Sequence, residues 1–173
     1  MLKLNIGGTE QRDGWKIFNV NAGPHVDFVG DILDLSRFAD GSVDEIYASH
    51  VLEHVWLEQA KAVLRAFARI LAPGGRLMLS VPDLPTLCRI YLDPRLSQKQ
   101  SMQVMGMIYG AHLDEHDIHH AGYDETLMRA ILTEAGFRRI RRVDDHGMFQ
   151  DTSVLRIFDM PISLNIQAQR SLV

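Results

Sequence analysis

The hydrophobic positions change period between residues 43 and 83, and this change predicts a strand, a helix and a second strand. Glu45 to Ser49 is a short apolar run that stops at polar residues. Apolar residues then recur at helical spacing from Leu57 to Leu71, so one face of a helix is expected to be buried. Leu77 to Val81 is almost continuously apolar, which is typical of a strand covered on both faces. We therefore predict a right-handed strand–helix–strand unit with parallel strands.

Proline and glycine residues mark the end of the helix, and polar residues mark the ends of the strands. Pro73, Gly74 and Gly75 end the helix, because proline cannot continue it and glycine accepts positive φ. The first strand ends at Ser49 and His50, and the second ends at Pro82 and Asp83. Ligands of open α/β sheets bind at the carboxyl ends of the strands, so this edge is the expected site.

The N-terminal part of the chain predicts three short strands with little between them. These are Leu2–Ile6, Ile17–Val20 and His25–Gly30. Gly7 and Gly8 directly follow the first strand, where they allow the backbone to approach a ligand closely or simply form a tight turn. The interval before Ile17 is too short for the helix that a dinucleotide-binding unit needs, which argues against a nicotinamide-dependent oxidoreductase.

The C-terminal half predicts three helices and two strands. The expected elements are a helix over Pro85–Asp93, one from Ser97 to Gly110, one capped by Asp124 and closed by Gly136, a strand over Phe137–Val143 and a last strand over Asp151–Pro161. Residues 162–173 show little pattern and are expected to fray. The methionines of the second helix are expected to pack in the core, or else to cover a binding pocket. Four arginines between residues 138 and 142 are expected to lie on a solvated strand face.

Composition and charge exclude several classes of protein. The chain has 173 residues, 46% apolar and 23% charged, which suits one globular domain. A net charge of −4 does not favour nucleic-acid binding. The single cysteine, Cys88, fits a reducing compartment, and no apolar run is long enough to span a membrane. We expect a cytoplasmic protein without nucleic-acid or membrane partners.

A histidine-rich segment lies between residues 112 and 120. His112, His116 and His120 are spaced by four, so on a helix they would share a face that could bind a metal. Histidines in loops are more often solvated or hydrogen-bonded, and we expect no metal. Either His119 or His120 could instead serve as a general base, or hold the loop to the domain.

The run D-E-I-Y-A-S-H-V-L-E-H, followed by L-A-P-G-G-R-L, resembles the class I S-adenosylmethionine-dependent methyltransferases, most closely the small bacterial type 11 kind. The resemblance extends from Leu2 to about Val143. It implies a Rossmann-like α/β fold, with a mostly parallel seven-stranded sheet, a C-terminal antiparallel pair and truncated N-terminal helices. It further implies one domain over residues 1–173, in which residues 84–123 form a helical insertion over the acceptor site.

The resemblance also assigns a cofactor site for S-adenosylmethionine. The glycines after the first strand would face its methionine part, Asn21 its ribose, and Asp31 and Ile32 its adenine, while the end of the fourth strand would lie at the boundary with the acceptor. The implied cofactor-binding residues are Gly7, Gly8, Asn21, Asp31, Ile32, Ser49 and His50. The chain departs from the family at two points, because G-G-T-E replaces a fuller glycine motif and Asn21 replaces a carboxylate.

The function implied by the resemblance is methyl transfer to a small-molecule or glycan acceptor. A hydroxyl acceptor needs a base, and the candidates are His50, ranked first, His119 and His120. His54 is expected to pack at a helix start. The alternative is a non-catalytic binding module of the same fold, which the eroded glycine motif and Asn21 would favour. Without the N-terminal helices, a bare apolar patch on one sheet face would favour a homodimer.

Overall fold

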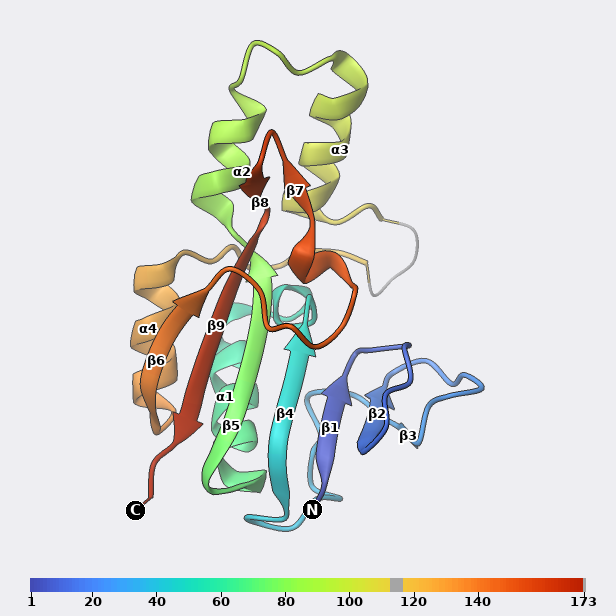
Figure 1. Ribbon diagram of the computed structural model, residues 1–173, viewed down its shortest axis with the longest axis vertical. Coiled ribbons are helices and arrows are strands. Elements are labelled where there is room, and N and C mark those ends of the chain that lie inside the picture. Colours follow the sequence, from blue (N-terminus) through green and yellow to red (C-terminus); the bar gives the residue numbers. More distant parts are fainter. Residues whose placement is uncertain (113–116, 173) are drawn as a thin grey trace.

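The computed structural model describes residues 1–112 and 117–172, and its centre is one seven-stranded sheet (Figure 1). The strand order is β3-β2-β1-β4-β5-β9-β6. The strands are β1 (Lys3–Ile6), β2 (Trp15–Asn19), β3 (Phe28–Val29), β4 (Val43–Ser49), β5 (Leu71–Pro82), β6 (Phe137–Val143) and β9 (Ser163–Arg170). The helices are α1 (Leu57–Ile70), α2 (Leu84–Tyr91), α3 (Gln98–Tyr109) and α4 (Glu125–Glu134).

Strand direction divides the sheet into a parallel part and an antiparallel part. The strands β3, β2, β1, β4 and β5 pair in parallel, so their carboxyl ends meet at one edge. By contrast, β9 runs antiparallel to both of its neighbours, β5 and β6. This arrangement confirms the predicted mostly parallel sheet with a C-terminal antiparallel pair.

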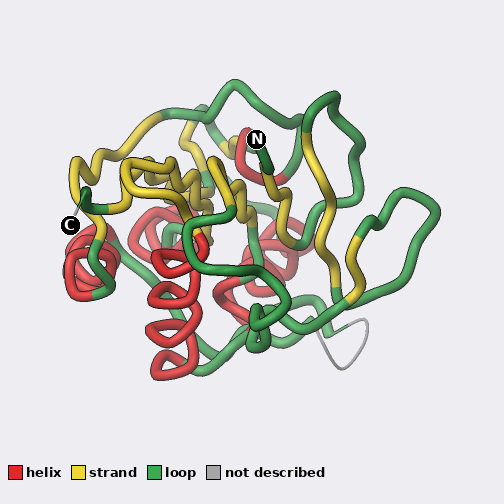
Figure 2. The backbone as a smooth tube through the Cα atoms, turned by 90° about the horizontal axis from the view of Figure 1, so that it is seen from below, coloured by secondary structure: helices red, strands yellow, loops and turns green. Residues whose placement is uncertain are grey.

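The helices α1 and α4 cover one face of the sheet and form the main core with it (Figure 2). Alternate residues of each strand point into this core, for example Leu77 and Leu79 of β5 and Leu164 and Ile166 of β9. The helix α1 contributes a stripe at helical spacing that is fully buried, including Leu64 and Phe67. The amphipathic helix predicted over Leu57–Leu71 is therefore confirmed, and its apolar face is buried against the sheet.

The opposite face of the sheet is largely polar. Glu45 forms ion pairs with Lys3 and with Arg76, one from each neighbouring strand. The loop after β6 crosses this face and brings Phe149 against Trp15 and Tyr47 (Figure 1). Between β1 and β4 the described chain contains strands and loops only, and the short interval before Ile17 predicted the absence of a helix after β1. Ion pairs and the aromatic cluster of Trp15, Tyr47 and Phe149 share this face, and the possible homodimer stays a prediction.

The predicted last strand over Asp151–Pro161 is wrong. That segment forms a single 3₁₀ turn, η2 (Thr152–Val154), and a small hairpin of β7 (Arg156–Ile157) and β8 (Met160–Pro161). The actual strand, β9, lies in the segment that was expected to fray. Its sequence S-L-N-I-Q-A-Q-R alternates apolar and polar residues, as a strand with two different faces should.

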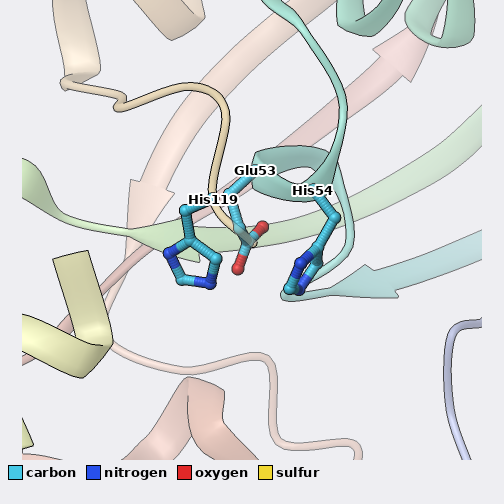
Figure 3. A group of neighbouring side chains, drawn as sticks. All are labelled: Glu53, His54 and His119. Atoms are coloured by element: carbon cyan, nitrogen blue, oxygen red, sulfur yellow. The ribbon is translucent and has the colours of Figure 1, made fainter. Parts of the chain in front are cut away.

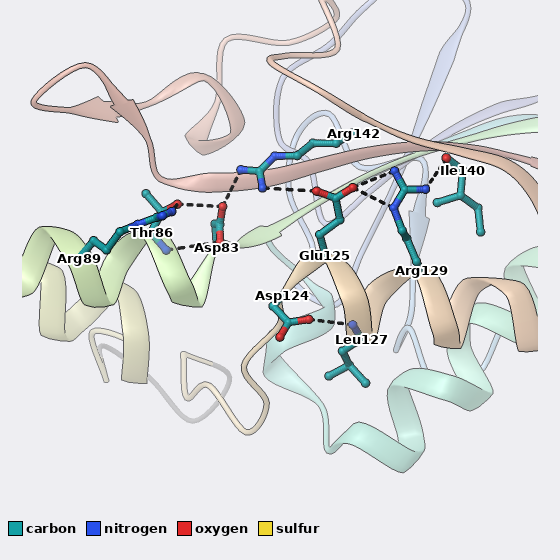
Figure 4. Close-up of polar contacts among 9 residues, drawn as sticks. All are labelled: Asp83, Thr86, Arg89, Asp124, Glu125, Leu127, Arg129, Ile140 and Arg142. Carbon is teal, nitrogen blue, oxygen red and sulfur yellow. Dashed lines mark hydrogen bonds and ion pairs between the residues drawn. The ribbon is translucent and has the colours of Figure 1, made fainter.

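A buried carboxylate joins four elements near the ligand-binding edge (Figure 4). Asp83, 2% exposed, follows β5 and accepts hydrogen bonds from the Thr86 backbone and hydroxyl at the start of α2. Arg142 of β6 donates to the same carboxylate at 2.6 Å and lies 3.7 Å from Glu125 of α4. One of the four arginines expected on a solvated face therefore has a structural partner.

Replacing Arg142 by methionine should lower the free energy of unfolding by about 1–3 kcal/mol, because the buried Asp83 carboxylate would lose its charged partner. Urea unfolding followed by circular dichroism measures the loss. Arg141→Met is the matched control, since Arg141 lies on the same strand and bonds only the exposed Gln167 side chain. Equal losses in the two variants would contradict a special role for the Asp83 pair.

Within the described residues, no helix combines the length and apolar character needed to cross a membrane.

Candidate active site

Two pockets open at the carboxyl edge of the parallel strands. The first, called here the β1–β2 pocket, has a volume of about 470 Å³ and lies over the ends of those two strands. The second, called the α3 pocket, has a volume of about 850 Å³ and lies between α3 and the turn after β4. Both volumes are in the range of small-molecule sites.

The β1–β2 pocket contains most of the residues predicted to bind the cofactor. Gly7, Asn21, Asp31 and Ile32 all line it. Asp31 also accepts a hydrogen bond from the Leu33 backbone, so its carboxylate both shapes the turn and faces the pocket.

The turn after β1 brings bare backbone to this pocket. Gly7 has φ of +77°, and a Cβ there would lie 2.1 Å from a methyl carbon of Val51. The Asn19 side chain donates to the carbonyl oxygens of Gly7 and Gly8, both at 3.1 Å, and so ties the end of β2 to the glycine turn. This role of Asn19 was not predicted, although its position at a strand end was the available signal.

Three predicted cofactor residues do not line the β1–β2 pocket. Gly8 lies beside it, with its backbone held by Asn19. The Ser49 hydroxyl is buried without a hydrogen-bond partner among the described residues. His50 lines the α3 pocket instead. In their place, Trp56 and Gln59 at the start of α1 complete the wall, and neither was predicted.

The α3 pocket has a mostly apolar wall and a floor of histidines. Met102, Met105 and Tyr109 of α3 line it and are 64%, 38% and 59% exposed. The expectation that the α3 methionines pack in the core is therefore wrong for Met102 and Met105, and Val104 is the residue that α3 buries fully. The insertion expected over residues 84–123 supplies this wall, apart from the part that lies outside the described residues.

His54 and Asp117 line both pockets, and therefore mark their junction. His54 belongs to the 3₁₀ turn η1 (Leu52–His54) directly after β4. It was expected only to pack at a helix start, and it does not stand out by spacing or charge. Its position where the pockets meet is visible only in the folded chain.

His50 is held at both ring nitrogens. Its Nδ1 lies 3.1 Å from Glu53 Oε1, and its Nε2 lies 2.9 Å from Ser163 Oγ. Because the Ser163 hydroxyl donates to the Thr152 carbonyl, it accepts from His50, whose Nε2 therefore carries a proton. His50 also has φ of +53°, an unusual value for a residue other than glycine. Because both of its ring nitrogens are engaged in these contacts, neither is free to accept a proton from a ligand in the pocket.

Glu53 is fully buried, yet its carboxyl group favours the charged form. Burial acts to raise the pKa of Glu53, but the contact with His50 and the charges of His50 and His54 outweigh it and lower the pKa overall. Neither carboxylate oxygen receives a hydrogen bond of normal geometry from the described residues. Glu53 is thus a buried anion with incomplete pairing.

His119 and His120 face different pockets. His119 lines the α3 pocket, and its ring meets that of His54 edge to face at 4.8 Å. Its Nδ1 donates to the Ile108 carbonyl at 3.3 Å, and burial lowers the pKa of His119, so its Nε2 bears a lone pair. His120 lines the β1–β2 pocket, with its ring 4.4 Å from that of Trp56.

The helical spacing considered for metal binding is not what brings these histidines together. His112 bonds the Tyr109 carbonyl at the exposed rim, and His116 lies outside the described residues. Two contacts instead bring the loop before α4 to the turn after β4. The His120 amide donates to the Glu53 carbonyl at 2.8 Å, and the Tyr123 hydroxyl donates to the Leu52 carbonyl at 3.1 Å.

Known proteins resemble this chain in sequence and in fold. A family model described as a methyltransferase domain matches residues 10–79. An uncharacterised 37.1 kDa protein of a Streptomyces fradiae transposon is 32% identical over 123 residues. That match covers 71% of this chain, which spans about a third of the relative's length (32%).

Solved structures share the fold at low sequence identity. An S-adenosylmethionine-dependent methyltransferase from Archaeoglobus fulgidus superimposes with a TM-score of 0.62 at 15% identity, over 98% of this chain and 86% of that one. A Burkholderia thailandensis 1,6-didemethyltoxoflavin-N1-methyltransferase, solved with that compound and S-adenosylhomocysteine, gives 0.61 at 16% identity, over 98% and 71%.

The sheet order and the two pockets define a Rossmann-like fold of the class I methyltransferases. The family match over residues 10–79 and the shared fold agree with the resemblance predicted from the sequence, whose implied cofactor is S-adenosylmethionine. The β1–β2 pocket fits this cofactor, because it combines bare backbone at Gly7 with the polar groups of Asn21 and Asp31 and the apolar Ile32.

Gly7→Ala should destabilise the protein more than Gly14→Ala and should abolish cofactor binding. Both glycines have positive φ, so either alanine costs about 1–2 kcal/mol in backbone strain. A Cβ at Gly14 meets nothing within 4 Å, whereas one at Gly7 displaces Val51 and adds about 1–3 kcal/mol. Urea unfolding compares the two, and equal losses would show that the close approach at Gly7 is unimportant.

Proposed function

We propose that this chain transfers a methyl group from S-adenosylmethionine to an acceptor held in the α3 pocket. The observation that carries the proposal is the meeting of the two pockets at His54 and Asp117, at the carboxyl edge of the sheet. When bound, S-adenosylmethionine supplies a methyl group on a sulfonium, which already provides the leaving group. The protein's task is then to hold two molecules in line, close together and away from water.

The β1–β2 pocket is proposed to hold the cofactor through residues predicted from the sequence. Gly7 allows the backbone to approach the methionine part, and Asn21 bonds the ribose hydroxyls as a neutral donor and acceptor. Asp31 accepts from the adenine amino group while Ile32 packs on the ring. His120 and Trp56 close the side of the pocket that faces the junction.

The predicted histidines receive distinct roles. His119 is proposed as the residue that faces the acceptor's reacting atom, since its Nε2 is directed away from its bond to the Ile108 carbonyl. His50 is proposed as a positioning residue for Glu53, because both of its ring nitrogens are engaged. His120 is proposed to belong to the cofactor pocket and not to the acceptor side.

The acceptor is proposed to be a small molecule or a glycan with an apolar portion. Exposed methionines and Tyr109 line the α3 pocket, and methionine faces adapt to irregular apolar shapes. Lys99 and Gln103 of the same helix offer polar contacts. Residues 84–123 are proposed to act as the cover of this pocket within one domain. The single cysteine, which is free and exposed, supports a reducing, cytoplasmic setting.

The second candidate is a non-catalytic binding module of the same fold. Two observations favour it: the shortened glycine motif and the neutral Asn21 in place of a carboxylate. Against it, Gly7, Asn21, Asp31 and Ile32 line one pocket. The proposed methyltransferase must bind S-adenosylmethionine, whereas the non-catalytic module need not bind it.

S-adenosylmethionine at about a hundred times its dissociation constant should raise the melting temperature by roughly 5–11 °C, since such binding adds about 2.7 kcal/mol. Asp31→Ala should reduce this rise, because the adenine amino group loses its acceptor. Asp34→Ala is the matched control: its carboxylate caps a turn in the same way as that of Asp31, through the Ser36 amide, but does not line the pocket.

No rise at millimolar S-adenosylmethionine or S-adenosylhomocysteine would favour the non-catalytic module. A rise that survives Asp31→Ala unchanged would place the cofactor elsewhere.

His119→Ala should abolish methyl transfer while leaving the cofactor-dependent rise in melting temperature intact. The assay is transfer of radiolabel from methyl-labelled S-adenosylmethionine to a panel of sugar nucleotides and phenols. His112→Ala, at the exposed rim of the same pocket, should retain transfer to any substrate that the parent protein labels. Retained transfer in the His119 variant would remove this residue from the reacting centre.

A further inference from the structure

Three potential metal ligands converge at the floor of the α3 pocket. Glu53, His54 and His119 each place one ligand atom so that the three atoms lie within 4.8 Å of one another (Figure 3). Two of the residues come from the turn after β4, and His119 comes from the loop before α4. All three line the α3 pocket, although Glu53 itself is fully buried.

The polar atoms of this cluster lack the partners that buried groups normally have. Both oxygens of Glu53 and Nδ1 of His54 are buried without a hydrogen bond from the described residues. The other buried carboxylate in this region, Asp83, accepts from Thr86 and Arg142. His50 Nδ1 lies 3.1 Å from Oε1 without a hydrogen bond of normal geometry, and Oε2 has no partner among the described residues, so this buried carboxylate is only partly compensated. Such a group at the bottom of a pocket indicates a ligand that completes it.

We propose that Glu53, His54 and His119 bind a divalent transition-metal ion. Two imidazoles and one carboxylate suit zinc, cobalt or iron, whereas magnesium prefers oxygen ligands. Bonds of about 2.1 Å place neighbouring ligand atoms roughly 3–3.5 Å apart, so modest rotations of these side chains close the observed spread. The set differs from the His112, His116 and His120 spacing considered from the sequence.

The surroundings of the three ligands are arranged as metal sites require. His119 donates its Nδ1 proton to the Ile108 carbonyl, which fixes the ring with Nε2 toward the cluster. Glu53 is contacted by His50, which Ser163 holds in turn. The backbone bond from His120 to Glu53 fixes the two segments relative to one another. His119 and Glu53 therefore each have a second contact that orients them.

The ion would occupy the acceptor side of the junction. Because His54 also lines the β1–β2 pocket, a ligand of the ion reaches the wall of the cofactor site. With the ion bound, the Nε2 lone pair of His119 would be used on the metal, so the ion and not the free imidazole would contact the acceptor hydroxyl and make it a stronger acid. This role for the ion depends on the proposed methyl transfer, whereas the binding of the ion does not.

Titration of the metal-free full-length protein with Co²⁺ tests the site. One equivalent should produce visible absorption bands of cobalt with mixed nitrogen and oxygen ligands, and Zn²⁺ should displace them. Zn²⁺ retained after dialysis, measured by elemental analysis, should also be one equivalent. Mg²⁺ at the same concentration should displace neither ion.

Glu53→Gln and His119→Ala should each weaken Co²⁺ binding by at least ~100-fold, since even second contacts of metal ligands are worth 10–100-fold. His25→Ala is the control, because His25 is exposed and far from the cluster in sequence. Circular dichroism checks that each variant is folded, and the half-buried His119 gives a second test should Glu53→Gln not fold. Unchanged binding in a folded His119→Ala variant would overturn the proposal.

Two results separate this proposal from the proposed function. Stoichiometric Co²⁺ binding without a thermal response to S-adenosylmethionine would support the metal site and overturn methyl transfer. A thermal response to S-adenosylmethionine without Co²⁺ bands would overturn the metal site, and would leave Glu53 paired only with its neighbouring histidines.

Discussion

The hydrogen bond from the His120 amide to the Glu53 carbonyl links two segments that contribute residues to both pockets. It joins the loop before α4 to the turn after β4, two segments that are far apart in the sequence. On one side of this bond His119 reaches the α3 pocket, and on the other His120 reaches Trp56 and the β1–β2 pocket. Because it joins backbone groups, many side-chain changes nearby would leave it intact.

The sheet around this junction is built asymmetrically. One face is an apolar core under α1 and α4, and the other bears ion pairs and a crossing loop. The main core supplies most of the buried apolar area, so the polar face contributes chiefly through paired charges such as Glu45 with Arg76. The chain thereby forms the ligand-binding edge of its fold with only strands and loops between β1 and β4.

Periodicity and strand-end polarity predicted the parallel core of the fold, and the family resemblance predicted four residues that line the β1–β2 pocket. The motif around His50 marked the end of β4, and Gly7 and Gly8 marked the turn after β1. Both could be predicted because local sequence determines where a strand ends and a turn begins. The final strand was missed because the apolar cluster around Leu155 outweighed the regular alternation over Ser163–Arg170. Roles such as those of Asn19, His54 and the unpaired Glu53 depend on contacts between distant segments, and no local pattern contains them.

His54 forms part of the wall of both pockets, and this shared position has a thermodynamic consequence. Any shift of its ring that accompanies the binding of one ligand changes the shape offered to the other. The two ligands are then linked, and each must alter the affinity of the other by the same factor. A single imidazole at the boundary would thus make the affinity for each proposed ligand depend on whether the other is bound, by the same factor whichever binds first.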